Sequence, residues 1–117
     1  MIVDSGLQHI ADQMSDQSQV VMSHLAVGTG TNAETASQTA LQTEIARVVL
    51  TSKTRSDKKA VYVGDFAAGV GTGALTEVGL LNAASAGDML SRIVFPVKNK
   101  GPNDTLKITI EHTYARG

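Results

Sequence analysis

The feature that most restricts the fold is a segment of strict alternation close to the end of the chain. In TLKITIEHTY, residues 105–114, the side chains on one parity are apolar or aromatic with one histidine, and those on the other are mainly charged or hydroxyl-bearing. The first set shares one face of an extended chain: Leu106, Ile108, Ile110, His112 and Tyr114. A period of two is typical of a β-strand with one buried face. The segment therefore predicts a strand that must pack against other strands.

Five further segments are rich in aliphatic and β-branched residues and are bounded by glycine-rich or polar turns. They cover residues 20–27, 44–52, 60–67, 74–81 and 88–97. Such segments are typical of strands. Because the polar stretch 53–59 is short and charged, we expect 44–52 and 60–67 to form a hairpin with a basic tip. Pro96 cannot donate a ladder hydrogen bond, so the end of its strand should lie at a sheet edge or run into a loop.

The first residues have a different period. Apolar side chains recur at spacings of three and four over residues 2–14, which predicts a short amphipathic helix, and Asp4 or Ser5 could cap its start. The apolar stripe is larger than a small β-domain needs, so we expect part of it to contact a partner. Its members are Ile2, Leu7, Ile10 and Met14. We divide the chain into a helix with its connector, 1–19, and a β-domain, 20–117.

Six strands without helical patterns between them predict a mainly β fold, an antiparallel β-sandwich or a small barrel, preceded by one short helix. The same observation argues against a parallel α/β fold. A length of 117 residues fits one domain. Aromatic residues make up only 3% of the chain, so the core must be aliphatic.

Charge and cysteine content restrict the possible partners. Ten basic against eleven acidic residues give a formal net charge of −1, so we expect neither nucleic acid nor a membrane surface as partner. The chain has no cysteine, which suits folding in a reducing compartment. The first residues lack the basic and apolar pattern of a secretory signal or a membrane span, so we expect synthesis in the cytoplasm.

The sequence offers no convincing catalytic, cofactor or metal site, and we do not expect an enzyme. The glycine-rich segments lack the Lys-Ser/Thr of a phosphate-binding loop, and His9, His24 and His112 have no partner at ligand spacing. Two acid–base pairs lie in or beside apolar strands, where a charge requires a partner. We interpret both as ordinary ion pairs: Glu44 with Arg47, and Glu77 with Arg92.

The segment 28–40 is rich in Gly, Thr, Ser and Ala and has no apolar period. Loops of this length without structure of their own are often functional or become ordered against a partner. We therefore expect 28–40 to be a contact element.

Three linked blocks resemble small structural proteins of tailed-bacteriophage particles. They are GTGT followed by TALQTEIAR, then GTGALTEVGLLNA, then MLSRIVFPVKNKGPNDTLKIT. The similarity extends from about Ser23 to Tyr114. The last residues, ITIEHTYARG, depart from the pattern, because the corresponding segment of such proteins is more apolar.

The resemblance implies a jelly-roll-like β-sandwich on the outside of the particle. Such proteins are head decoration or cement proteins that bind the major capsid protein, or parts of tail fibres, adaptors and baseplates, and both possibilities remain open. They form homo-oligomers, contact other virion proteins and are found in the virion. The resemblance implies contact residues in three loops: Gly28, Thr29, Gly30 and Thr31; Gly71, Thr72 and Gly73; and Asn99, Lys100 and Gly101.

Overall fold

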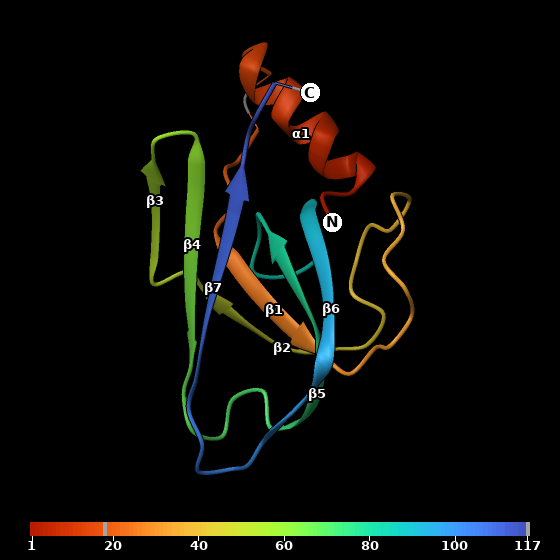
Figure 1. Ribbon diagram of the computed structural model, residues 1–117, viewed down its shortest axis with the longest axis vertical. Coiled ribbons are helices and arrows are strands. Elements are labelled where there is room, and N and C mark those ends of the chain that lie inside the picture. The colour runs from red at the N-terminus through yellow and green to blue at the C-terminus, as the bar shows by residue number, and fades with distance from the viewer. Residues whose placement is uncertain (18, 117) are drawn as a thin grey trace.

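The computed structural model describes residues 1–17 and 19–116. Within them the chain forms one helix and seven strands (Figure 1). The elements are α1 (Asp4–Met14), β1 (His24–Gly28), β2 (Glu44–Val49), β3 (Ser52–Ser56), β4 (Lys59–Phe66), β5 (Gly73–Leu81), β6 (Met89–Lys100) and β7 (Leu106–Thr113). The strands form a four-stranded antiparallel sheet, β2-β1-β5-β6, and a three-stranded one, β3-β4-β7. The predicted mainly β fold with one N-terminal helix is confirmed.

The two sheets share one hydrophobic core. Leu25 and Val27 of β1 pack with Leu75 and Val78 of β5, and the same cluster includes residues of the other sheet: Phe66 of β4 and Ile110 of β7. The side chains are almost all aliphatic, as the composition requires. Each sheet therefore buries one face against the other.

The alternating segment near the end of the chain is a strand, as predicted. β7 pairs with β4 from Leu106 opposite Phe66 to Thr113 opposite Lys59. Its even-numbered side chains are buried or half-buried up to His112, and the odd-numbered ones are exposed. The placement of Pro96 at a sheet edge is also confirmed, because β6 is the last strand of its sheet.

The predicted hairpin between 44–52 and 60–67 is wrong. β2 pairs with β1 in the four-stranded sheet, whereas β4 pairs with β3 in the other sheet. The chain changes sheets near Leu50, whose N–H donates to the carbonyl of Ser23, and Thr51, whose N–H donates to Val63. The supposed tip is mostly strand β3, and the turn is only Asp57 and Lys58. An aspartate tolerates the positive φ of 55° that this tight turn requires.

Two predicted strand limits also change. The first strand begins at His24 rather than Val20, because Val20 and Val21 are exposed and the carbonyl of Val20 binds the side chains of His9 and Asn82 instead of a neighbouring strand. β6 continues past Pro96 to Lys100, which pairs with Gly73 at the start of β5.

Helix α1 lies across one end of the molecule and is attached to the first half of β6 (Figure 1). The N–H of Val3 donates to the Leu90 carbonyl, and the Ser5 hydroxyl donates to the carbonyl of Met89. The predicted cap at Asp4 or Ser5 is wrong, because both residues lie inside the helix and Val3 is its N-cap. Because Val3 is fully buried, the start of the chain is part of the packed structure. The predicted segment 1–19 includes Ser18, and the segment 20–117 includes Gly117; both residues lie outside the described ones.

Candidate protein-binding surface

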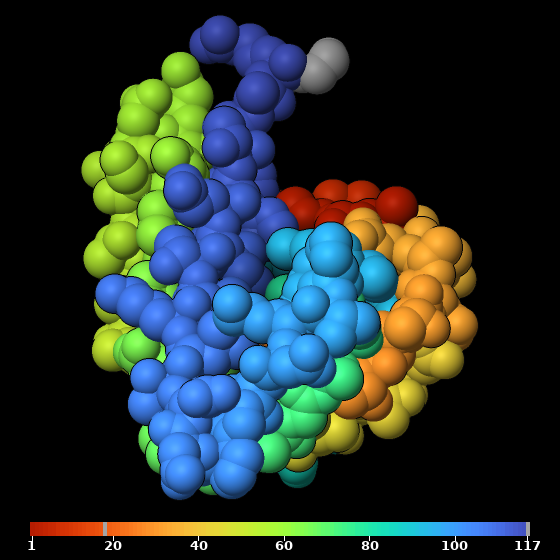
Figure 2. Space-filling model, turned by 60° about the horizontal axis from the view of Figure 1, so that its bottom comes forward, coloured from red at the N-terminus to blue at the C-terminus, as the bar shows by residue number. Residues whose placement is uncertain are grey.

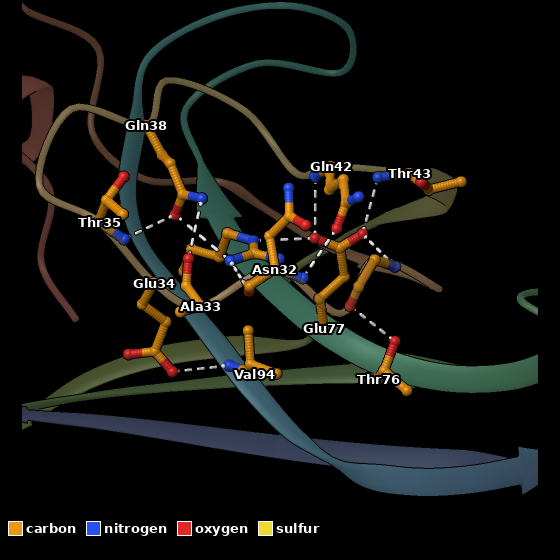
Figure 3. A network of polar contacts seen from close by, with 12 residues as sticks. Asn32, Ala33, Glu34, Thr35, Gln38, Gln42, Thr43, Thr76, Glu77 and Val94 are labelled. Carbon is orange, nitrogen blue, oxygen red and sulfur yellow. Dashed lines mark hydrogen bonds and ion pairs between the residues drawn. The ribbon is translucent and has the colours of Figure 1, made fainter.

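An ion pair is buried beside the glycine-containing loop 28–31. Glu77 of β5 and Arg92 of β6 lie on adjacent strands, and the Arg92 Nε donates to the Glu77 Oε1 over 2.9 Å (Figure 3). Both side chains are 0% exposed. The predicted Glu77–Arg92 pair is confirmed. A charge pair this deeply buried is stable only when most of its remaining hydrogen-bonding groups also find partners. Within the described residues, the Arg92 Nη2 is buried without one.

The Glu77 carboxylate finds them in the backbone of the preceding loop. Its Oε2 accepts the N–H groups of Gly30 and Thr43, and its Oε1 accepts that of Gln42, all at 2.8–2.9 Å. Burial raises the pKa of this carboxyl. The three N–H groups and the guanidinium of Arg92 outweigh burial and hold the pKa below the ordinary 4.5. Glu77 is therefore ionised at neutral pH.

These bonds determine the shape of the loop that we expected to become ordered only against a partner. The segment 28–43 folds around the carboxylate, and a Cβ on Gly28 or Gly30 would lie 2.5 Å from its Oε2. Only glycine leaves the space for this close approach. The hydroxyl of Thr76 donates to the Gly30 carbonyl and holds the same turn from the other side.

The far half of this loop is held by the other partner of the pair. The Arg92 Nη1 donates to the Asn32 carbonyl and to the Gln38 side chain, and the Glu34 carboxylate accepts the N–H of Val94 (Figure 3). That hydrogen bond lowers the pKa of Glu34. The loop is thus tied to the sheet along its length without any partner.

The other two predicted contact loops meet at the end of the molecule opposite α1. Gly73 pairs with Lys100 and Ala74 with Asn99. Lys100 is almost fully buried, and its Nζ donates to the carbonyls of Ala67 and Asp104. Its charge therefore fixes two turns of its own chain. The exposed members of these loops are Thr72 and Asn99; Gly73 and Gly101 are half-buried, and Gly71 is buried.

The predicted helix residues lie near a second feature, an apolar groove of about 430 Å³ between α1 and the upper ends of β4 and β7. The lining on the helix side consists of His9, Ile10, Gln13 and Met14. Two tyrosines, Tyr62 and Tyr114, line the side of β4 and β7. The rest of the lining is Val21 and Met22 of the connector and Leu90 of β6. Figure 2 shows the residues that follow β7, in dark blue up to residue 116, standing away from the body that carries α1. We call this feature the helix groove.

Exposed apolar side chains gather along the helix groove. Met14 is 83% exposed, and Val20 and Val21 are 62% and 53% exposed. Single exposed apolar residues are ordinary, but a group beside a groove is typical of an interaction site. Of the four predicted helix contacts, Ile10 and Met14 line the groove, Leu7 is exposed outside its lining, and Ile2 is half-buried and bridges to Ser91 of β6.

The helix groove has few polar groups. The Nε2 of His9 donates to the carbonyl of Val20 over 2.6 Å. Burial raises the pKa of Tyr62 and of Tyr114, so both phenols stay neutral. The groove thus favours an apolar partner segment that can also accept or donate a few hydrogen bonds.

The predicted contact residues therefore lie in three places: on α1 and just before it, around Glu77, and at the opposite end of the sheets. Sequence reasoning did not identify the helix groove, since its walls come from five separate segments of the chain. Besides the predicted helix residues Ile10 and Met14, a further signal was the pair of valines at 20 and 21, which the structure leaves exposed rather than in a strand.

The second predicted ion pair is also present. Arg47 binds both carboxylate oxygens of Glu44, and its Nη1 donates to the carbonyls of Ala83 and Ala86 in the turn between β5 and β6. This pair therefore holds a turn.

No family model matches the sequence, and no curated protein matches it significantly. Within residues 1–17 and 19–116, no group of three or more His, Asp or Glu side chains is placed to hold a metal ion. The described part of the chain also has no helix with the length and apolar character needed to cross a membrane.

Proposed function

We propose that this protein is a structural component of a tailed-bacteriophage particle, a decoration or cement protein that binds the major capsid protein and stabilises the shell. In this proposal the two sheets form a jelly-roll-like sandwich, the protein forms homo-oligomers, and it is found in the virion. The proposal depends on the resemblance of the three sequence blocks and on how those blocks are used in the fold.

The observation that carries the proposal is that the three blocks converge on one network. Gly30 comes from the first block, Gln42 and Thr43 from its continuation, Glu77 from the second block and Arg92 from the third. Residues that must cooperate in three dimensions are a more specific basis for a resemblance than three separate short motifs. The three blocks thus contribute to one structural unit of this chain, which supports treating them together as one pattern.

A binding role fits the chemistry of the buried pair better than a catalytic one. A general base needs a free lone pair within reach of a substrate proton. The carboxylate of Glu77 already accepts four hydrogen bonds and is closed off from solvent. In this proposal Glu77 therefore has a structural role.

The helix groove is the surface that we propose for the capsid contact. We expect the double substitution Met14→Lys and Val21→Lys to weaken binding to heads that lack the protein by about thirtyfold, because each lysine places a charge where an apolar partner is buried. Folding should be unchanged, since both side chains are more than half exposed. The measurement is a titration of purified variant onto such heads, with bound protein quantified after sedimentation.

A matched control is available on the sheets. Val49 and Val97 are 66% and 59% exposed and lie outside the groove, so Val49→Lys with Val97→Lys makes the same chemical change elsewhere. The control variant should bind heads as the wild type does. Equal loss of binding in both variants, or none in either, would remove the helix groove from the proposal.

Particle membership is tested separately by mass spectrometry of purified virions with copy counting. A decoration protein covers a shell of many capsid subunits and should be present in on the order of hundreds of copies. About a dozen copies would indicate a tail component instead. Absence from the particle would contradict the proposal.

A further inference from the structure

A second groove lies between the free edges of the two sheets, away from the helix groove. It has a volume of about 360 Å³ and is lined by β6 and β7, with Val78 of β5 at its base. The apolar residues of the lining are Val78, Ile93, Phe95, Leu106, Ile108 and Ile110. In Figure 2, β6 in light blue and β7 in blue lie next to each other at the front of the molecule. We call this groove the β6–β7 groove.

The groove follows the backbone edge of β7 as well as its inner face. Five consecutive residues, 106–110, line it, including the outward-facing Lys107 and Thr109. Residues of both parities line one groove only where the strand edge borders that groove. β7 has a hydrogen-bonded neighbour, β4, on one side only. Alternate residues of β7 therefore present free N–H and C=O groups to the groove.

The edge of β6 across the groove is less available. The N–H of Arg92 donates to the carbonyl of Met1, and that of Val94 donates to the Glu34 carboxylate. Pro96, farther along, has no N–H to donate. A strand that enters this groove would consequently pair with β7 and extend the three-stranded sheet.

The charges at the groove restrict what can enter. Its lining includes two lysines, Lys98 and Lys107, and no carboxylate. Neither lysine takes part in an ion pair within the described part of the chain. Both lie at the end next to the turn 101–105. Asp65, which pairs with Lys107 in the register of β4 and β7, binds the Thr51 hydroxyl instead.

We propose that the β6–β7 groove binds an extended segment of another protein chain, about five residues long, with alternating apolar side chains and acidic residues at the end near Lys98 and Lys107. The segment adds a strand to β7, its apolar side chains cover Ile108 and Phe95, and its carboxylates pair with the two lysines. Five extended residues span about 17 Å, the length of strand that borders the groove. This inference concerns a different surface from the helix groove and does not depend on a phage origin.

The test uses synthetic peptides and the full chain labelled with ¹⁵N. One peptide has two aspartates followed by alternating valine and threonine; a second has lysines in place of the aspartates; a third has proline in place of the central threonine. We expect the acidic peptide to bind, to shift the amide signals of residues 106–110, and to slow hydrogen exchange there. The proline peptide should not bind, because it cannot complete the ladder.

Charge reversal supplies the decisive comparison. In the double variant Lys98→Glu with Lys107→Glu, both substituted side chains are exposed, so folding is preserved. This variant should bind the acidic peptide about tenfold more weakly and the lysine peptide more tightly than the wild type does. The matched control, Lys58→Glu with Arg116→Glu, makes the same change in net charge on exposed residues outside the groove and should behave as wild type.

Three results would overturn the inference. The first is the absence of binding by any of the peptides. The second is binding that shifts the signals of the helix groove rather than those of β7, or that ignores the charge reversal. The third is concentration-dependent protection of residues 106–110 without peptide, which would show that a second copy of this chain occupies the groove.

Discussion

Replacing Glu77 with glutamine should lower the free energy of unfolding by about 3–5 kcal/mol, because it leaves the Arg92 guanidinium buried without a counter-charge. The glutamine side chain would also place an NH₂ group, which cannot accept a hydrogen bond, where one carboxylate oxygen accepts two. All four partners of the carboxylate, the N–H groups of Gly30, Gln42 and Thr43 and the Arg92 Nε, can only donate. One of them at least must then lose its bond. Urea denaturation followed by circular dichroism measures the change.

The control makes the same substitution at an exposed ion pair. Glu111 binds the Lys59 Nζ over 2.8 Å, and both side chains are well exposed. Exposed pairs contribute about 0–1 kcal/mol, so Glu111→Gln should change stability little. Similar losses in the two variants would mean that the buried network does not hold the fold together.

The loss in Glu77→Gln should not be uniform over the chain. The loop 28–43 is tied to the sheets mainly through Glu77 and Arg92, so its amides should exchange with solvent much faster in the variant. β4 and β7 pair with each other in the other sheet. Relative to the global free energy of unfolding, their amides should be as well protected from exchange in the variant as in the wild type. Hydrogen exchange therefore distinguishes the loss of this network from general destabilisation.

The parts of the fold that could be predicted from sequence are those with a local signal. The alternation from Leu106 to Tyr114 identified β7, its inner face and its end within a residue or two. Glu77 and Arg92 were identified as partners because charged residues within apolar strands must be compensated. The start of the chain was identified as a helix from its period, although its main-chain attachment to β6 has no local signal.

The change of sheet between β2 and β3 could not be predicted in the same way. The apolar run from Val48 to Leu50 continues across the point where the chain leaves one sheet for the other. β3 follows with side chains that are all exposed, so it has no alternation to indicate a strand. Its pairing with β4 is a tertiary preference that overrides the polar composition. A hairpin was the simpler interpretation of the same residues.

The loop 28–43 illustrates a different limit. Its order comes from backbone N–H groups that bind a carboxylate 34 to 47 residues away in sequence, and backbone donors leave no mark on residue type. The sign of this order in the sequence is the pair of glycines at 28 and 30, for which the resemblance to phage proteins implied contact with a partner. In the fold both are buried against Glu77, so Thr29 and Thr31 are the members of that motif with surface to offer a partner.

Acidification should destabilise the protein through the same carboxylate. Because the pKa of Glu77 is held below 4.5 in the folded state, the unfolded chain binds the proton first as the pH falls. The stabilisation is therefore fully present above pH 4.5 and is lost as the pH falls through the folded-state pKa. Protonation removes the same negative charge as the glutamine substitution does, so acid and Glu77→Gln should destabilise the protein in the same way.

His112 adds an earlier and smaller contribution of the same sign. Burial lowers its pKa below 6.5, so the unfolded chain takes up a proton first and stability begins to decline below pH 6.5. Urea midpoints measured from pH 7 to pH 3 should thus fall gently at first and steeply below pH 4.5. In Glu77→Gln the steep part should be much reduced, whereas Glu111→Gln should retain it.

A direct measurement on the wild type avoids any dependence on the stability of the variant. The ¹³C signal of the Glu77 side-chain carboxyl should keep the shift of an ionised group throughout the folded range, because protonation would break its bonds to Arg92 and the loop. It should change only when the protein unfolds in acid. A signal that titrates near pH 4.5 in the folded protein, while the loop amides stay protected, would show that the network tolerates a neutral Glu77, and the acid sensitivity would then have to come from Glu34 and His112.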